Sequence, residues 1–456
     1  MTEFKNIIQA ERKFFRTGIP AKTVYREKML KRMLAWIETN ETQILKALQA
    51  DLGKAPFEGY MTEVGIVKEE LRYALKHIRS WAGVKKVVSP LTQFPACSFQ
   101  YPEPYGVVLI LSPWNYPFQL TVVPLLSAIA AGNCVVVKPS GQSVHTSKLL
   151  QRMVRQVFRP DHVSIVNGGR GENAALLEEK FDYIFFTGSV AVGKLVMKKA
   201  AEHLTPVSLE LGGKSPCIVD ETADIPMAAR RIVWGKFLNA GQTCVAPDYI
   251  LVQYSVQDKL LHQMEKMIRK MYGSDPILSP DYPHIINRRH YDRLCSLMKE
   301  GTVAIGGQRN EDRLTIAPTV LLDVTWEDAV MKEEIFGPIL PVISFFDLKE
   351  AVHMVQAQPR PLALYLFTGK KSREKRILSS LSFGGGCIND TVVHLASTAL
   401  PFGGVGASGM GSYHGKAGFD TFTHQKSIMK KAVKIDLPVR YAPYGKKLKL
   451  LKAVQH

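Results

Sequence analysis

The sequence predicts an α/β protein built on two doubly wound sheets of mainly parallel strands. From about residue 107 onward, short uninterrupted apolar runs alternate with segments long enough to form helices. Such runs are typical of strands buried on both faces, which is how parallel sheets occur. Glycines and polar residues follow several of the runs, at the edge where such sheets bind ligands. At 456 residues and 46% hydrophobic, the chain can form two or three domains.

The segment up to about residue 80 is predicted to be helical. Its apolar residues recur at the spacing of one helix face, which is the pattern of an amphipathic helix. They are Leu30, Met33, Leu34, Ile37, Ile44, Leu45 and Leu48, and then Val64, Ile66, Val67, Leu71, Leu75 and Ile78. Prolines end this pattern and mark a change of organisation. They are Pro90, Pro95, Pro102 and Pro104.

Two groups of strands follow the helical segment. The first group comprises residues 107–111, 135–137, 163–166 and 183–186, and Lys138, Gly168 and Gly188 lie at the ends of these runs. The second group follows Glu210 and comprises residues 217–219, 249–252 and 362–367. The gap between the groups predicts a separate second domain.

Composition excludes several classes of protein. The six cysteines form no Cys-x-x-Cys pair, which argues against a disulfide framework and a zinc site, so no metal site is expected. The first residues lack an apolar signal core, and the longest apolar stretch, residues 120–131, is too short to span a bilayer. We therefore expect a soluble, cytoplasmic protein.

The formal net charge is +18, and lysines crowd the C-terminal end. One interpretation is attraction to anionic lipid or nucleic acid. The other, which we favour, is a solvated tail and a positive field that attracts an anionic dinucleotide. No nucleic-acid-binding motif accompanies the charge, so no such partner is expected. Residues 446–456 hold only scattered apolar side chains, which argues against stable membrane anchoring but permits weak association with a membrane surface.

Cys244 and Glu210 carry the strongest chemical signal. A free cysteine usually acts as a small buried hydrophobe, and that interpretation suffices for Cys97, Cys134, Cys217, Cys295 and Cys387. Cys244 instead follows Gly241-Gln242-Thr243 on an expected turn, and Glu210 lies 34 positions upstream beside two glycines. A thiolate that captures a carbonyl and a carboxylate that activates water together indicate acyl-enzyme chemistry.

These two segments resemble the signature of the aldehyde dehydrogenase superfamily. Four more motifs lie in the family's order between positions 113 and 338. They are Pro113-Trp114-Asn115-Tyr116-Pro117, Val137-Lys138-Pro139-Ser140, Phe186-Thr187-Gly188-Ser189 with Gly193, and Glu333-Glu334-Ile335-Phe336-Gly337-Pro338. The stretch from Leu400 to Lys416, the short N-terminal segment and Arg440-Tyr441-Ala442-Pro443-Tyr444 resemble the class-3 branch.

The resemblance implies an aldehyde dehydrogenase-like fold with a cofactor domain, a catalytic domain and a β bridging arm. The cofactor domain would comprise residues 1–82 and 106–210, and the catalytic domain residues 211–421. The arm, residues 83–105 and 422–434, would add strands to a partner subunit in a homodimer. Residues 435–456 would form a C-terminal tail.

The resemblance also assigns roles. An aldehyde would be oxidised to its acid with NAD or NADP, with Cys244 as nucleophile, Glu210 as the base for the hydrolytic water and Asn115 as an oxyanion donor. Bound cofactor and nearby amides would lower the pKa of the Cys244 thiol. The residues expected to bind the cofactor are Trp114, Lys138, Thr187, Gly188, Ser189, Gly193, Glu334 and Phe336. Class-3 resemblance suggests medium-chain aliphatic or aromatic aldehydes, with Tyr60, Trp234, Thr243 and His394 as candidate pocket residues.

One position departs from the family. Its ribose motif commonly ends in Glu, whereas Lys138-Pro139-Ser140 is followed here by Gly141. The missing carboxylate would otherwise accept a ribose hydrogen bond and repel a 2′-phosphate. We therefore expect NADP to be used at least comparably to NAD, and Gly141→Glu to shift preference toward NAD.

Other motifs and functions fit the sequence less well. Residues 208–215 approach a phosphate-binding P-loop but lack its first glycine, and Pro216 obstructs the helix that must follow. Residues 169–174 fit G-x-G-x-x-A, but no acidic residue ends a strand about 20 residues later. A CoA-acylating aldehyde dehydrogenase would use the same cysteine without needing Glu210. A non-catalytic protein that binds polyanions or membrane surfaces would leave Cys244, Glu210 and Asn115 unexplained.

Overall fold

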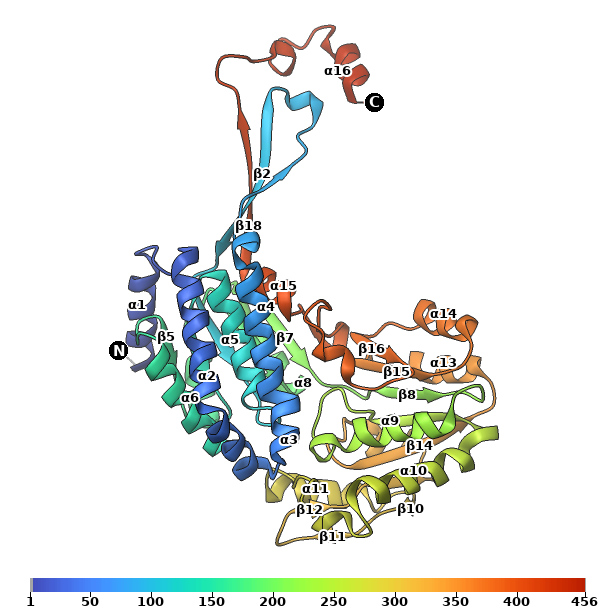
Figure 1. Ribbon diagram of the computed structural model, residues 1–456. Coiled ribbons are helices and arrows are strands. Elements are labelled where there is room, and N and C mark those ends of the chain that lie inside the picture. Colours follow the sequence, from blue (N-terminus) through green and yellow to red (C-terminus); the bar gives the residue numbers. More distant parts are fainter. Residues whose placement is uncertain (1–2, 456) are drawn as a thin grey trace.

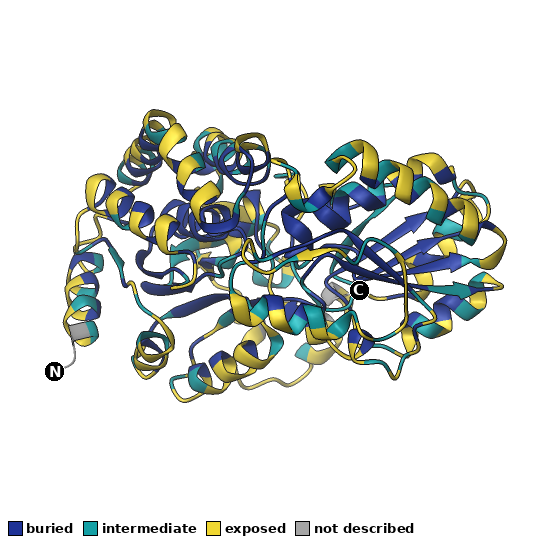
Figure 2. Ribbon diagram, turned by 90° about the horizontal axis from the view of Figure 1, so that it is seen from below, coloured by how far each residue is buried: buried dark blue, intermediate teal, exposed yellow. Residues whose placement is uncertain are grey.

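Two α/β bodies lie side by side, and a slender arm projects from them (Figure 1). The structure is a computed structural model, which describes residues 3–455. Buried residues run along the strands and the inner faces of the helices in both bodies (Figure 2). Each body therefore has the layered architecture expected from the alternation of apolar runs and helices.

The first body contains a six-stranded sheet in the order β17-β7-β6-β3-β4-β5. Its strands are β3 (Val107–Leu111), β4 (Cys134–Lys138), β5 (Val163–Ile165), β6 (Tyr183–Gly188), β7 (Val207–Leu211) and β17 (Gly409–Met410). All are parallel to their neighbours except β17. The four strands expected in this region are present. Because the chain runs from β3 to β5 on one side and returns to β6 on the other, the carboxyl ends of β3 and β6 border the crevice where ligands bind in such folds.

Helices cover both faces of this sheet (Figure 1). They are α1 (Glu3–Phe15), α2 (Thr23–Leu52), α3 (Pro56–Gly59), α4 (Gly65–Trp81), α5 (Gln119–Ala131), α6 (Val144–Val157), α7 (Arg170–Leu177) and α8 (Val190–Ala201), with the π-helical turn η1 (Tyr60–Val64) between α3 and α4. The helical N-terminal segment is thus confirmed. Every residue of α5 is buried, because α2 and α4 pack on it. That burial explains why α5 contains the longest apolar stretch of the chain.

The second body contains a seven-stranded sheet in the order β10-β13-β14-β9-β8-β15-β16. Its strands are β8 (Pro216–Val219), β9 (Tyr249–Gln253), β10 (Thr302–Ile305), β13 (Thr319–Leu322), β14 (Ile339–Phe345), β15 (Ala363–Phe367) and β16 (Gly385–Ile388). A separate hairpin joins β11 (Arg309–Asn310) and β12 (Thr315–Ile316). The main helices here are α9 (Ile225–Phe237), α10 (Gln257–Tyr272), α11 (Arg288–Leu297), α13 (Leu348–Gln356) and α14 (Lys371–Ser380), and α12 (Ala329–Lys332) is a single turn.

The arm is an antiparallel sheet of three strands in the order β1-β2-β18. They are β1 (Lys85–Val87), β2 (Ala96–Pro104) and β18 (Thr423–Lys431). Near the far end of the arm lies the C-terminal helix α16 (Lys447–Gln455), which packs on the short turn η2 (Leu91–Gln93) (Figure 1). The segments expected to form an arm therefore pair with each other.

One segment does not lie where the expected division of the chain places it. Residues 409–421 were grouped with the second body, but β17 pairs with β7 of the first sheet. The helix α15 (Gly415–Thr421) packs on α5 and α4 of the first body. The proposed domain boundaries remain a prediction, and this segment belongs structurally with the first sheet. Within residues 3–455, no helix is both long and apolar enough to cross a membrane.

Candidate active site

Cys244 lies on a turn that joins α9 to β9 and has an unusual backbone. The 3₁₀ turn η3 (Leu238–Gly241) contains Asn239 and Ala240 at φ values of 52° and 51°, followed by Gly241 at 72°. Left-handed backbone of this kind is uncommon outside glycine and clusters at functional sites. A Cβ atom at Gly241 would lie 2.2 Å from the carbonyl oxygen of Gly337, so only glycine fits there. The expected turn before Cys244 is present.

Cys244 and Glu210 line one small cavity of about 40 Å³ between the two bodies. This volume has room for only a few water molecules, by the measure that about 10–15 Å³ holds one. Glu210 lies near the carboxyl end of β7, is 3% exposed, and neither carboxyl oxygen has a hydrogen-bond partner. Burial raises the pKa of Glu210 well above its usual value. The structure thus brings the expected nucleophile and base together. Burial favours the neutral, protonated form of the Glu210 carboxyl group.

The thiol environment differs from the expected one. Burial raises the pKa of Cys244, and Glu334 and Glu210 add to the effect. In the protein without bound ligand, the thiol form of Cys244 is therefore favoured over the thiolate. A positive charge placed in the cavity would counter both causes, and the protein supplies no such charge among the residues that line it.

Asn115 lies on the loop after β3 and is 2% exposed. Its Nδ2 donates a hydrogen bond of 3.1 Å to the carbonyl oxygen of Gln242, two residues before Cys244. The neighbouring Tyr116 hydroxyl bonds to the Thr243 hydroxyl at 2.6 Å. The loop that carries Asn115 is therefore tied directly to the loop that carries Cys244, although Asn115 itself does not line the Cys244 cavity.

A second, larger cavity of about 530 Å³ lies at the carboxyl ends of β3 and β4. Lys138 lines it and donates hydrogen bonds to the carbonyl oxygens of Pro139 and Gly168, at 2.9 and 2.8 Å. Burial lowers the pKa of Lys138. Lys148 and Arg170 also line this cavity, and no acidic residue does so among the described residues. An elongated anion with several phosphates suits this lining.

The turn from β6 to α8 has the predicted form. Thr187 and Gly188 end the strand, and Ser189 precedes the first residue of α8, so free amides of the first helical turn face the sheet edge. Gly193 packs closely on Leu211, because a Cβ atom there would lie 2.6 Å from a methyl carbon of Leu211. The hydroxyl oxygen of Thr187 is buried without a partner and borders the Cys244 cavity.

Glu334 and Phe336 approach the site from the loop before β14. A Cβ atom at Gly212 would lie 1.9 Å from a carboxyl oxygen of Glu334, so Gly212 makes room for this side chain. Burial, together with Asp248, raises the pKa of Glu334 to about 8, and its Oε1 has no partner. Phe336 has a positive φ of 50°, and its ring meets Trp114 edge-on at 5.4 Å. The Glu334 carboxyl group thus occupies the space that a side chain at position 212 would fill.

These residues fit a dinucleotide. A buried polar atom without a partner costs free energy unless a ligand satisfies it, and Thr187 Oγ1 and Glu334 Oε1 are two such atoms on the expected path. The cationic cavity at Lys138 lies at the crevice where dinucleotides bind in this sheet topology. Lys138 would hold the adenosine side, and Glu334 with Phe336 the nicotinamide side.

The candidate substrate pocket is partly corrected. Of the four residues suggested by resemblance, only Thr243 lines the Cys244 cavity, whereas Tyr60, Trp234 and His394 do not. Its apolar and aromatic walls instead include Leu120, Leu362, Leu395, Phe402 and Tyr413. Phe402 and Tyr413 belong to the class-3-like stretch 400–416, whose sequence gave no indication of which side chains point inward.

His414 is a further residue that the sequence did not reveal. It lines the same cavity, and its Nδ1 lies 2.7 Å from Glu70 Oε1, with both side chains 2% exposed. The second oxygen of Glu70 accepts from the Gly415 amide at 2.9 Å. Glu70 thereby orients the imidazole, although the two residues are 344 positions apart.

A sheet with the topology of dinucleotide-binding folds, together with a cavity shared by a cysteine and a carboxylate, is the arrangement of a thiol-dependent dehydrogenase. The chain matches the sequence pattern of the Aldehyde dehydrogenase family over residues 2–428, and it belongs to that family. It is 48% identical over 442 residues to 4,4'-diaponeurosporen-aldehyde dehydrogenase of Staphylococcus aureus, covering 96% of each chain. It is 44% identical to Aldehyde dehydrogenase family 3 member H1 of Arabidopsis thaliana, covering 99% of this chain and 95% of the relative.

Solved structures agree with the sequence relatives. A substrate-bound Staphylococcus aureus AldH superposes with a TM-score of 0.98 at 46% identity, covering all of both chains. An NAD-dependent aldehyde dehydrogenase from Sinorhizobium meliloti superposes with a TM-score of 0.87 at 28% identity, covering 97% of this chain and 88% of the other. The class-3-like resemblance and the α/β fold class are thereby confirmed, and the protein is an NAD(P)-dependent aldehyde dehydrogenase.

Proposed function

We propose that the protein oxidises an aldehyde to its carboxylic acid through a covalent adduct on Cys244, with Glu210 as the base that activates the hydrolytic water. The observation that carries this proposal is the shared cavity, which places a half-buried thiol and an unpartnered carboxyl group within one small space. A carboxyl group without a hydrogen-bond partner in such a space is suited to a water molecule.

The residues divide the chemistry between them. The Cys244 sulfur attacks the carbonyl carbon, and the oxyanion that forms accepts hydrogen bonds from the Asn115 side-chain amide and the Cys244 backbone amide. One such donor typically contributes about 3 kcal/mol. Bound NAD or NADP would supply the acceptor for the hydride that leaves the substrate carbon, and this oxidation would leave a thioester on Cys244. Glu210, once ionised, removes a proton from the water that attacks this thioester, and the acid departs.

Medium-chain aliphatic or aromatic aldehydes are the proposed substrates. The walls of the cavity support this class, because Leu120, Leu395, Phe402 and Tyr413 offer apolar contacts. One relative is named for 4,4'-diaponeurosporen-aldehyde, so that compound belongs in the panel of aldehydes to be tested.

Homodimerisation through the arm is part of the proposal. It is supported by the order of the arm sheet, in which β1 and β18 both have an unpaired edge. Exposed apolar residues Val88, Leu91 and Phe94 on the arm add to this support. We further propose a cytoplasmic enzyme with weak membrane-surface association through α16, whose exposed Leu448 lies among lysines.

The test is turnover of an aldehyde panel with NAD and NADP in the absence of CoA. Cys244→Ala is expected to abolish turnover, because the covalent adduct cannot form. Glu210→Gln is expected to give a burst of reduced cofactor about equal to the number of active sites, followed by slow turnover, because acylation survives but hydrolysis does not.

Normal steady turnover in either variant would remove its assigned role. A strict requirement for CoA would instead identify a CoA-acylating enzyme. A protein that turns over no aldehyde but binds anionic vesicles would support the non-catalytic alternative.

A further inference from the structure

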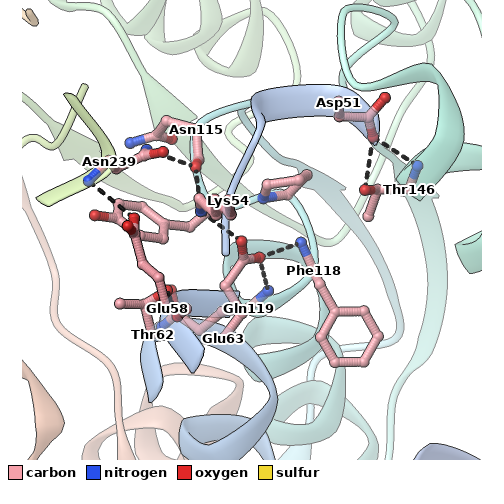
Figure 3. A network of polar contacts seen from close by, with 12 residues as sticks. Asp51, Lys54, Glu58, Thr62, Glu63, Asn115, Phe118, Gln119, Thr146 and Asn239 are labelled. Carbon is pink, nitrogen blue, oxygen red and sulfur yellow. Dashed lines mark hydrogen bonds and ion pairs between the residues drawn. The ribbon is translucent and has the colours of Figure 1, made fainter. Parts of the chain in front are cut away.

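A completely buried ion pair lies behind the loop that carries Asn115 (Figure 3). Lys54 follows the end of α2, and Glu63 lies in the π-helical turn η1. Both side chains are 0% exposed, and Lys54 Nζ lies 2.6 Å from Glu63 Oε1. Such a pair adds little net stability, because the cost of removing both charges from water offsets their attraction. A gain in stability therefore does not explain the pair, and we look for its role in the groups that it contacts.

The ion pair holds the main chain of the Asn115 loop. Lys54 Nζ donates a hydrogen bond of 2.9 Å to the Asn115 carbonyl oxygen. Glu63 Oε2 accepts from the amides of Phe118 and Gln119, at 2.8 and 3.2 Å, where α5 begins. Figure 3 shows Lys54 between Glu63 and Asn115. The loop is thus held at the start of α5 and at the residue that donates to the oxyanion.

Asn239 holds the same carbonyl from the opposite side. Its Nδ2 donates to the Asn115 carbonyl oxygen at 2.9 Å and to the Gln242 carbonyl oxygen at 3.1 Å. A primary amide has two N–H bonds, and Asn239 uses both of them to join the Asn115 loop to the Cys244 loop. The left-handed backbone of Asn239 is itself held by Glu58, whose Oε1 accepts from the Asn239 amide at 2.9 Å.

These contacts determine the direction of one N–H bond. Asn115 Nδ2 donates one hydrogen to the Gln242 carbonyl oxygen, which leaves its second hydrogen free. An oxyanion donor must lie about 2.7–3.1 Å from the position of the developing charge. A displacement of about 1 Å costs about 100-fold in rate. Among residues 3–455, Lys54 and Asn239 make the hydrogen bonds that hold the Asn115 carbonyl oxygen.

We propose that Lys54 and Asn239 are positioning residues for the oxyanion donor. They clamp the Asn115 carbonyl from both sides and so aim its side-chain amide at the adduct on Cys244, without contacting substrate or cofactor themselves. The inference rests on the proposed function. It implies that the N-terminal helical segment, which contains Lys54, helps to position a catalytic group.

The main test is the double variant Lys54→Met with Glu63→Gln, which removes both charges at once and leaves neither charge buried alone. We expect kcat to fall about 100-fold, with the KM for the cofactor unchanged. The rate at which iodoacetamide alkylates Cys244 should also be unchanged, since alkylation forms no oxyanion.

Arg26→Met is the matched control. Arg26 is a second buried cation, which lies on α2 and is 5% exposed, and it donates to the carbonyl oxygens of Pro20, Ala21 and Ala130 rather than to either active-site loop. Its variant should lose thermal stability and keep kcat. A fall in kcat that matches that of the double variant would overturn the proposal, because loss of any buried cation would then suffice.

Asn115→Ala completes the experiment as a double-mutant cycle. If Lys54 acts through Asn115, the Lys54 and Glu63 changes should reduce kcat little further in the Asn115→Ala background, whereas a general structural role would give additive losses. Should the double variant not fold, Asn239→Asp carries the test, because it removes at least one donated hydrogen bond and keeps the size of the side chain. Additive losses with Cys244→Ala inactive would overturn this inference alone and leave the proposed function in place.

Discussion

At the scale of single residues, Gly141 shows how a structure changes the meaning of a missing side chain. A Cβ atom at Gly141 would lie 2.6 Å from the carbonyl oxygen of Gly168. Lys138 donates to that same oxygen at 2.8 Å. Any side chain at position 141 therefore displaces Gly168 and disturbs Lys138. Gly141→Glu, which from the sequence should shift preference toward NAD, is now expected to weaken the use of both cofactors.

Lys138→Met gives a cleaner test of cofactor choice. In the unmodified enzyme we expect kcat/KM for NADP to be at least comparable to that for NAD, because the Lys138 cavity is cationic. The variant should lose about tenfold more kcat/KM with NADP than with NAD, since the 2′-phosphate loses a charged partner. Lys259→Met, on the exposed face of α10, is the control for loss of charge elsewhere. A hundredfold preference for NAD in the unmodified enzyme, or equal losses in Lys138→Met, would contradict this expectation.

At the scale of elements, the helix α1 carries a buried acid that makes its packing depend on pH. Glu11 is 0% exposed, and neither carboxyl oxygen has a hydrogen-bond partner. Burial raises the pKa of Glu11 to about 8, against the opposing effect of the nearby Ser164 hydroxyl and backbone, while Asp161 adds to the rise and Arg12 opposes it. The folded protein thus keeps a proton on Glu11 at pH values where the unfolded chain has lost it.

The sign of the pH effect follows. The stabilisation is fully present below the unfolded pKa of 4.5 and is lost as pH rises through the folded pKa of about 8. Glu11→Gln is neutral at every pH. Between pH 4.5 and about 8, we expect the unfolding free energy of this variant, minus that of the unmodified protein, to rise by about 1.4 kcal/mol per pH unit. Urea unfolding at pH 5.5, 6.5 and 7.5 measures it. Parallel stability curves for the two proteins would show that Glu11 does not titrate between the folded and unfolded states.

Elements also differ in how well the sequence predicted them. The buried strands β3, β4, β6 and β9 are uninterrupted apolar runs, so burial on both faces is visible in their composition. Other strands were not anticipated. β14 contains Pro341, and β16 begins with two glycines, so neither resembles a strand by composition. Each forms because a neighbouring parallel strand is in place to pair with it.

At the scale of the whole molecule, the arm separates the C-terminal tail from the catalytic centre. The helix α16 lies near the far end of the arm, against η2 (Figure 1). An enzyme that ends after Tyr444 is therefore expected to keep its kcat, because none of the removed residues that the structure describes, 445–455, lines either cavity of the same chain. Steady-state kinetics together with the oligomeric state measured by light scattering provide the check. A tenfold loss of kcat with an intact oligomer would place the tail at the active site of a partner subunit.

The sequence alone predicted the class of protein and its α/β fold. Short motifs such as Gly241-Gln242-Thr243-Cys244 predict a local turn, because their residues are neighbours in the chain. Apolar runs predict which strands are buried on both faces. The tertiary structure decided the contacts between segments far apart in the chain. These include the pairing of β17 with β7, the Glu334 carboxyl beside Gly212, the orientation of His414 by Glu70, and the clamp of Lys54 and Asn239 on Asn115. Periodicity and spacing report only on neighbours along the chain, whereas these contacts depend on how packed helices and sheets bring distant residues together.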